Sequence, residues 1–86
     1  MKPDIAPAQL RAARALVDWS RDQLAEAAQT TVRTLARIET GETVPRDSTL
    51  VAIRDALEAA GVSFIPENCG GPGVRLVQPA PHSAAA

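Results

Sequence analysis

The chain has 86 residues, with nine basic and ten acidic side chains and a formal net charge of -1 at pH 7. A chain of this length forms one small domain whose core is too modest for a deep catalytic cavity, so its size favours binding over chemistry. Hydrophobic residues make up 45% of the chain and aromatic residues 2%, which predicts a mostly α fold packed by aliphatic side chains. Because the whole chain is not basic, any surface for nucleic acid must be local.

Few residues of the chain can carry chemistry. A single cysteine excludes an internal disulfide, and no N-terminal apolar run is long enough for a signal peptide or a membrane span. One histidine and one cysteine supply neither a metal site nor a nucleophilic pair, and no titratable pair is placed for acid-base work. We therefore expect a cytoplasmic protein that is not an enzyme and has no cofactor, metal, membrane contact or small-molecule ligand.

The chain begins with an expected flexible arm over residues 1–7, followed by a first helix over residues 8–18. The helix is predicted by Leu10, Ala13 and Val17, which recur at helical spacing. Arg14 lies on the same stripe, and an arginine that faces a core needs an acidic partner, for which Glu39 is the candidate. The alternative is that Arg14 extends along its own stem to solvent.

The stretch from Trp19 to Gly41 predicts two short helices joined by a turn. Trp19 is expected to fill the join with the first helix, since a lone large aromatic is usually part of the core. Ser20 is a good N-cap, and Thr31 can cap the second of the two helices, which Gly41 ends. Helices separated by about three residues are typical of a helix-turn-helix.

A fourth helix is predicted from a cap at Asp47 or Ser48 to about Ala60, where Gly61 follows. Its apolar residues again recur at helical spacing, so these four helices form a compact domain over residues 8–61.

Two β-branched runs, residues 62–65 and 74–77, predict a C-terminal β-hairpin with a glycine-rich turn. A two-stranded hairpin is marginal alone, so it must pack on the fourth helix or against another chain. Residues 62–77 are therefore a possible dimerisation element. The apolar residues available for that contact are Phe64, Ile65, Val74, Leu76 and Val77. Residues 78–86 show no periodicity, which indicates a disordered tail.

The helix after Thr31 has an outward face suited to DNA. Counting 100° per residue from Leu35 directs Arg33 and Arg37 away from the core and leaves Val32 exposed. Arginine can bond guanine bidentately, and Val32 can meet a thymine methyl group. The alternative is an ordinary solvated face, but the preceding turn and capped helix favour DNA.

Phosphate contacts are expected beside this helix. Thr31 has a hydroxyl and neighbouring free N–H groups, while Arg21 begins the preceding helix and Arg46 lies in the following loop.

Residues 9–61 resemble the Xre-type, lambda-repressor-like helix-turn-helix family. The matching residues are Arg14, Trp19, Ser20, Leu24, Ala25, Thr31, Thr34, Leu35, Arg37, Ile38, Glu39, Gly41, Pro45, Thr49 and Leu50. The resemblance implies a structural salt bridge between Arg14 and Glu39. The chain departs from the family at Arg21, where glutamine is usual, and at Gln29 and Thr30, which replace a Gly-Val turn. Gln29 is therefore expected in a left-handed conformation.

Together these features predict a sequence-specific transcriptional regulator, a repressor that binds double-stranded DNA at an inverted-repeat operator as a homodimer. The alternative is a protein-interaction module, such as an antitoxin or an adaptor, with the same fold. The near-neutral charge and the apolar hairpin motivate this alternative.

Overall fold

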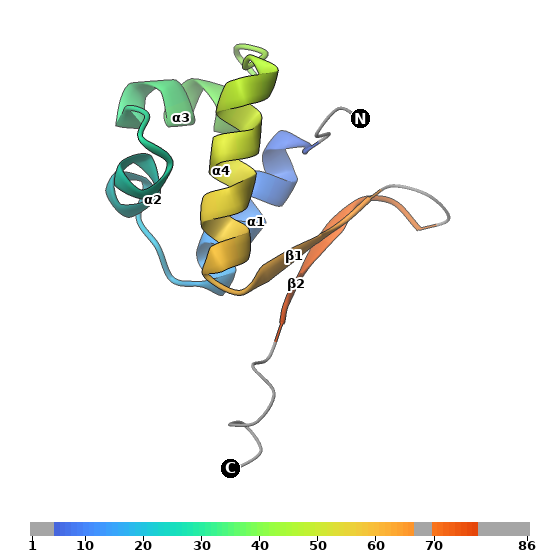
Figure 1. Ribbon diagram of the computed structural model, residues 1–86. Coiled ribbons are helices and arrows are strands. Elements are labelled where there is room, and N and C mark those ends of the chain that lie inside the picture. The colour runs from blue at the N-terminus through green and yellow to red at the C-terminus, as the bar shows by residue number, and fades with distance from the viewer. Residues whose placement is uncertain (1–4, 67–69, 78–86) are drawn as a thin grey trace.

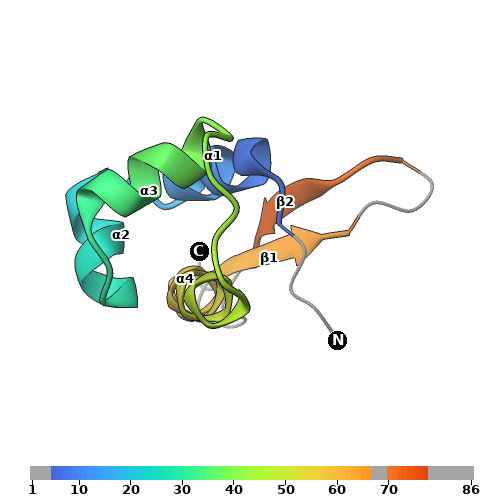
Figure 2. The same cartoon turned by 90° about the horizontal axis from the view of Figure 1, so that it is seen from above.

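The computed structural model describes residues 5–66 and 70–77, where four helices are followed by a two-stranded antiparallel sheet. The elements are α1 (Pro7–Leu16), α2 (Arg21–Ala28), α3 (Val32–Glu39), α4 (Asp47–Ala59), β1 (Val62–Ile65) and β2 (Gly73–Leu76). The hairpin extends from the end of α4 on the side away from α2 (Figures 1 and 2). The predicted mostly α fold is confirmed. Residues 1–4 of the predicted arm and the whole predicted tail, residues 78–86, lie outside the described residues.

The two helices of the helix-turn-helix begin at the predicted caps. The Ser20 hydroxyl accepts the Gln23 N–H at 3.2 Å, and the Gln23 side chain accepts the Ser20 N–H at 2.8 Å. The Thr31 hydroxyl accepts the Thr34 N–H at 3.1 Å. Because these bonds satisfy N–H groups that a helix start leaves without partners, they define where α2 and α3 begin.

The turn between α2 and α3 depends on the backbone of Gln29, which has φ 58° and ψ 47°. This is the left-handed conformation expected for it. The Thr30 N–H donates to the Ala25 carbonyl at 2.9 Å, so α2 ends and Thr31 can begin α3 at once.

Two helix boundaries differ from the predicted ones. Helix α1 ends at Leu16, because Asp18 has φ 59° and the Trp19 N–H turns back to the Arg14 carbonyl at 3.0 Å. The capping prediction for the fourth helix is wrong. Asp47 is the first helical residue, Arg46 is the N-cap, and no side chain caps this end. Asp47 still favours the helix start electrostatically, since an acid in the first turn complements the helix dipole.

Aliphatic side chains from all four helices and β1 form one core. Its members are Leu10, Ala13, Leu24, Ala25, Ala28, Leu35, Ile38, Ile53, Leu57 and Val62. Trp19 is partly buried against this core, next to the join for which it was predicted. Leu35 and Ile38 attach one face of α3 to the core, so the opposite face of α3 is left to solvent.

The hairpin turns one face toward the helices. Val62 pairs with Leu76 and Phe64 with Val74, and residues directly opposite each other share a face of the sheet. Val62 is buried, while Phe64 and Val74 pack against the core from its edge. The second strand begins one residue earlier than predicted, at Gly73, which pairs with Ile65.

A buried glutamine fastens the far end of the hairpin to α1. The Gln9 side-chain amide donates to the carbonyls of Ile65 at 3.1 Å and Gly73 at 3.0 Å. Its oxygen accepts the Ala6 N–H at 2.8 Å. Gln9 therefore ties both strands to the start of α1, which gives a marginal two-stranded sheet the support that it lacks alone.

Replacing Gln29 with glycine should stabilise the protein by about 0.5 to 1 kcal/mol, because glycine adopts the left-handed conformation without steric cost. Urea denaturation of wild type and Gln29→Gly measures the difference. The matched control is Ala27→Gly, two residues earlier inside α2, where glycine should lower the free energy of unfolding by about 1 kcal/mol. A loss of stability in both variants would contradict the role assigned to the turn.

Candidate nucleic-acid interface

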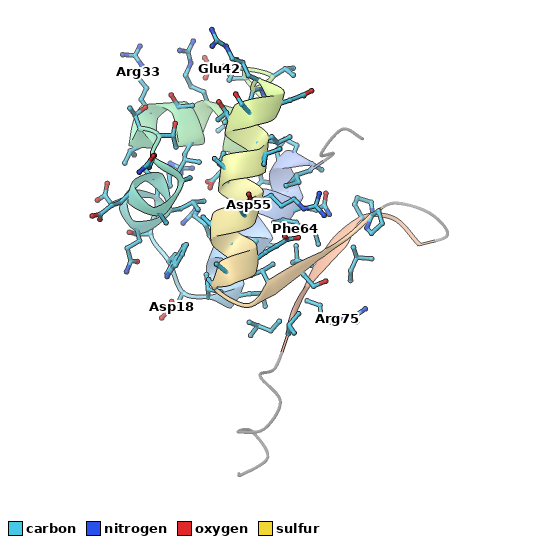
Figure 3. All side chains as sticks on the ribbon, in the orientation of Figure 1. Asp18, Arg33, Glu42, Asp55, Phe64 and Arg75 are labelled. Atoms are coloured by element: carbon cyan, nitrogen blue, oxygen red, sulfur yellow. The ribbon has the colours of Figure 1, made fainter. Side chains whose placement is uncertain are left out.

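The outward face of α3 carries the side chains predicted to contact bases. Val32 is 39% exposed, and Arg33 and Arg37 are also exposed. Arg33 points away from the helical body (Figure 3) and makes no ion pair with another described residue. The Arg37 Nε lies 4.0 Å from a Glu42 carboxylate oxygen, at the limit of an ion pair. Both guanidinium groups are therefore available to an external acceptor.

Thr31, the first predicted phosphate contact, lies at the start of this face. Its hydroxyl accepts the Thr34 N–H and donates to the Thr34 hydroxyl at 2.9 Å, so it already serves as a cap. Its side chain is exposed beside the first-turn N–H groups of α3, which favour an anion.

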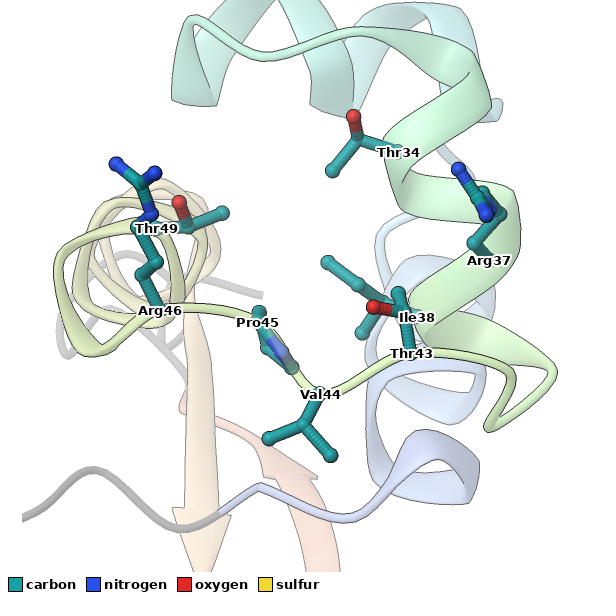
Figure 4. Close-up of a pocket in the computed structure, with 8 residues that line it drawn as sticks. All are labelled: Thr34, Arg37, Ile38, Thr43, Val44, Pro45, Arg46 and Thr49. Carbon is teal, nitrogen blue, oxygen red and sulfur yellow. The ribbon is translucent and has the colours of Figure 1, made fainter.

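An open hollow of about 300 Å³ separates α3 from the start of α4 (Figure 4). Its lining residues are Thr34, Arg37, Ile38, Thr43, Val44, Pro45, Arg46 and Thr49. Arg37 and Arg46 lie on opposite sides of it. Arg46, also predicted to contact phosphate, is exposed, and no acid among the described residues pairs with it. Val44 in the same loop is 92% exposed, and no sequence pattern singled it out.

A fully buried carboxylate lies behind the α3 face. Arg14 donates its Nε to one oxygen of Glu39 at 2.6 Å and its Nη2 to the other at 3.0 Å, and Glu39 is 0% exposed. The structure thus brings together the two residues proposed as a salt bridge, and Arg14 does not extend to solvent as the alternative required. Arg14 also donates to the Trp19 carbonyl at 2.9 Å, so one side chain joins α1 to the end of α3 and the entry to α2.

Two further arginines reach Glu39. Arg21, predicted to contact phosphate, donates its Nε to Glu39 at 2.9 Å, a contact that its position in the sequence did not suggest. Arg11 donates to the Glu39 backbone carbonyl, which is left without a helical partner at the end of α3. The sequence could have indicated this contact, because Arg11 lies three residues before Arg14 and therefore on the same side of α1.

The hairpin residues proposed for a dimer contact fall into two groups. Phe64 and Val74 pack against the core of their own chain, and Ile65 is half-buried. Leu76 and Val77 are 42% and 52% exposed, so they remain available to another chain.

Within residues 5–66 and 70–77 no three side chains are grouped as they would be around a metal ion. No helix in this part of the chain is both long and apolar enough to span a bilayer.

Electrostatic forces on Glu39 act in opposite directions. Burial alone would raise its pKa, but the hydrogen bonds and charges of Arg14 and Arg21 outweigh burial and hold the pKa below its usual range. A lowered pKa means that the ionised form stabilises the folded protein, and this stability is present above the pKa of the unfolded chain.

The free energy of unfolding should stay level from about pH 7 to about pH 5.5 and fall below about pH 4, as Glu39 is protonated. The Glu39→Gln variant should have a free energy of unfolding about 3 kcal/mol lower at neutral pH, because Arg14 and Arg21 lose their buried counter-charge. Its free energy of unfolding should also decrease less than that of wild type as the pH is lowered. Urea denaturation across this pH range tests both. Glu58→Gln is the control, since Glu58 forms an exposed pair with Arg54 and should change stability by less than about 1 kcal/mol. Identical pH profiles for Glu39→Gln and wild type would contradict this role.

Comparison with known proteins agrees with this geometry. The HTH_3 family model, described as helix-turn-helix, matches residues 10–62, which include most of α1 and all of α2, α3 and α4. A comparison with curated proteins finds no match. The family match covers more than half of the chain, and its matched region contains the capped helix pair and the buried Arg14–Glu39 bridge. The chain therefore belongs to the HTH_3 family of Xre-type, lambda-repressor-like helix-turn-helix DNA-binding proteins.

Proposed function

We propose that the protein is a sequence-specific transcriptional repressor that binds an inverted-repeat operator as a homodimer. The observation that carries this proposal is the outward face of α3, where Arg33 and Arg37 are exposed on a helix attached to the core by Leu35 and Ile38. Membership in a DNA-binding helix-turn-helix family supports the same conclusion.

In this proposal α3 lies in the major groove of DNA. Arg33 and Arg37 are four residues apart, about 6 Å along the helix axis, so they can reach different base pairs. Each can bond the O6 and N7 atoms of guanine, and Val32 can contact a thymine methyl group. Thr31 at the start of α3 and Arg46 at the start of α4 can hold the phosphates on either side of the groove.

One such module contacts few bases, so we propose that two copies act together. A dimer places two recognition helices about 34 Å apart on one side of the duplex and reads an inverted repeat. Occupation of a promoter by this dimer is the simplest route to repression. Leu76 and Val77 are the exposed apolar residues that we assign to the contact between copies.

Selection from random oligonucleotides should give a symmetric site. On that site, Arg33→Ala and Arg37→Ala should each cost about 1 to 3 kcal/mol and relax the base preference at one position. Arg46→Ala should instead weaken binding to cognate and random DNA alike and reduce the salt dependence of binding.

Binding is measured by gel shift or anisotropy at near-physiological salt. Equal losses on cognate and random DNA for all three variants would exclude direct readout by α3, and no specific binding at micromolar protein would favour the protein-interaction module.

The dimer contact can be tested without removing the hairpin, whose Val62 is part of the core. The double variant Leu76→Gln with Val77→Ser should sediment as a monomer where wild type sediments as a dimer, because both apolar surfaces become polar. Val51→Ser on α4 is the control, since Val51 is 41% exposed, close to the 42% of Leu76, but lies on another element. A dimer that survives in the double variant would place the contact on the helices.

A further inference from the structure

Positive charge exceeds negative charge where α1, the start of α2 and the end of α3 meet. The guanidinium groups of Arg11, Arg14 and Arg21 all contact Glu39, and one carboxylate balances only one of their three charges. Glu39 is the only acid that pairs with Arg14 or Arg21 among the described residues, and Arg11 pairs with none. These four side chains together therefore carry a net charge of +2.

Arg14 makes its contacts inside the protein. Its Nε and Nη2 bond both oxygens of Glu39, its Nη1 bonds the Trp19 carbonyl, and its side chain is 19% exposed. All three nitrogens are engaged inside the protein, so Arg14 is a structural residue.

Arg11 and Arg21 differ from Arg14, because each is anchored to Glu39 through one nitrogen. Arg21 uses Nε on the carboxylate and Arg11 uses Nη1 on the backbone carbonyl. The Arg21 side chain is 39% exposed and Arg11 is also exposed. Their remaining N–H groups have no acceptor among the described residues, although the anchoring bonds already limit how far both side chains can move.

We propose that Arg11 and Arg21 hold one phosphate group between them and that Glu39 is the positioning residue that presents both guanidinium groups to it. Phosphate suits this place because it supplies negative charge together with several strong acceptor oxygens, which match the donor fork of arginine. The identification of that phosphate as part of the operator backbone rests on the proposed function.

Salt dependence of DNA binding tests whether the two arginines share a phosphate. Each phosphate contact contributes about 0.9 to the slope of log affinity against log salt. Arg11→Gln and Arg21→Gln should each weaken operator binding by about 10-fold. The double variant should reduce the slope by about 1 in total, and its affinity loss should be smaller than the product of the single losses. The control is Arg54→Gln, an arginine paired with Glu58 on α4, which should leave the slope unchanged.

A slope reduced by about 2 with multiplicative losses would mean two separate phosphates and would overturn the shared site. A slope unchanged in the double variant would overturn it as well. Arg11→Lys and Arg21→Lys provide a check independent of the glutamine variants' folding. The lysine variants keep the positive charge but lose the paired N–H donors of the guanidinium group, so they should bind the operator more weakly with the same salt dependence.

Inorganic phosphate separates this inference from the proposed function. The melting temperature of wild type should be higher in sodium phosphate than in sodium chloride of equal ionic strength, and this difference should shrink in the double variant but not in Arg54→Gln. A wild-type response no larger than that of the double variant would overturn the anion site. If the phosphate response is lost in the double variant but wild type binds no DNA specifically, the anion site stands and the proposed function fails. If wild type binds its DNA site specifically but the double variant keeps the same salt slope, the proposed function stands and the shared phosphate site fails.

Discussion

The arrangement of the helices depends on one ion pair, the contact of the buried Glu39 carboxylate with Arg14. A charge removed from water costs several kcal/mol unless it is paired and hydrogen-bonded, so Glu39 is compatible with this core only in an arrangement that keeps Arg14 against it. The bidentate contact fixes the end of α3 against α1, and the bond from Arg14 to the Trp19 carbonyl extends this constraint to the start of α2. The outward face of α3 is oriented by these contacts together with the core.

The protein achieves a basic surface without a basic composition. Arg14 is engaged internally, whereas Arg33 and Arg46 have no ion-pair partner among the described residues and Arg37 has a distant one. The acids that bring the net charge to -1 include exposed Asp22, Glu26 and Asp55 on α2 and α4. Because salt screens exposed charges beyond about 10 Å, what matters for a DNA phosphate is the local arrangement rather than the sum over the chain.

The hairpin is held by its own chain more than its apolar composition suggests. Phe64 and Val74 pack toward the helices, and Gln9 bonds a carbonyl of each strand from a buried position on α1. These contacts leave Leu76 and Val77, near the base of the hairpin, as its most exposed large apolar residues. A contact with a second copy would therefore involve a smaller surface than the five apolar residues that the sequence made available for it.

The amino-acid sequence was enough to predict the four helices, the two caps of the helix-turn-helix, the left-handed Gln29 and the outward side of α3. The helices, the caps and the outward side of α3 follow from periodicity and from bonds between residues three or four apart, which are local, whereas the conformation of Gln29 was implied by the resemblance to a family with a Gly-Val turn there. Three sets of contacts could be seen only in the folded chain: the anchoring of Arg11 and Arg21 on Glu39, the contact of Gln9 with the hairpin, and the inward packing of Phe64 and Val74. The partners in the Gln9, Arg11 and Arg21 contacts are 18 or more residues apart. Which of several similar side chains meets a buried acceptor depends on how the helices pack, and sequence periodicity specifies the faces of the helices but not their neighbours.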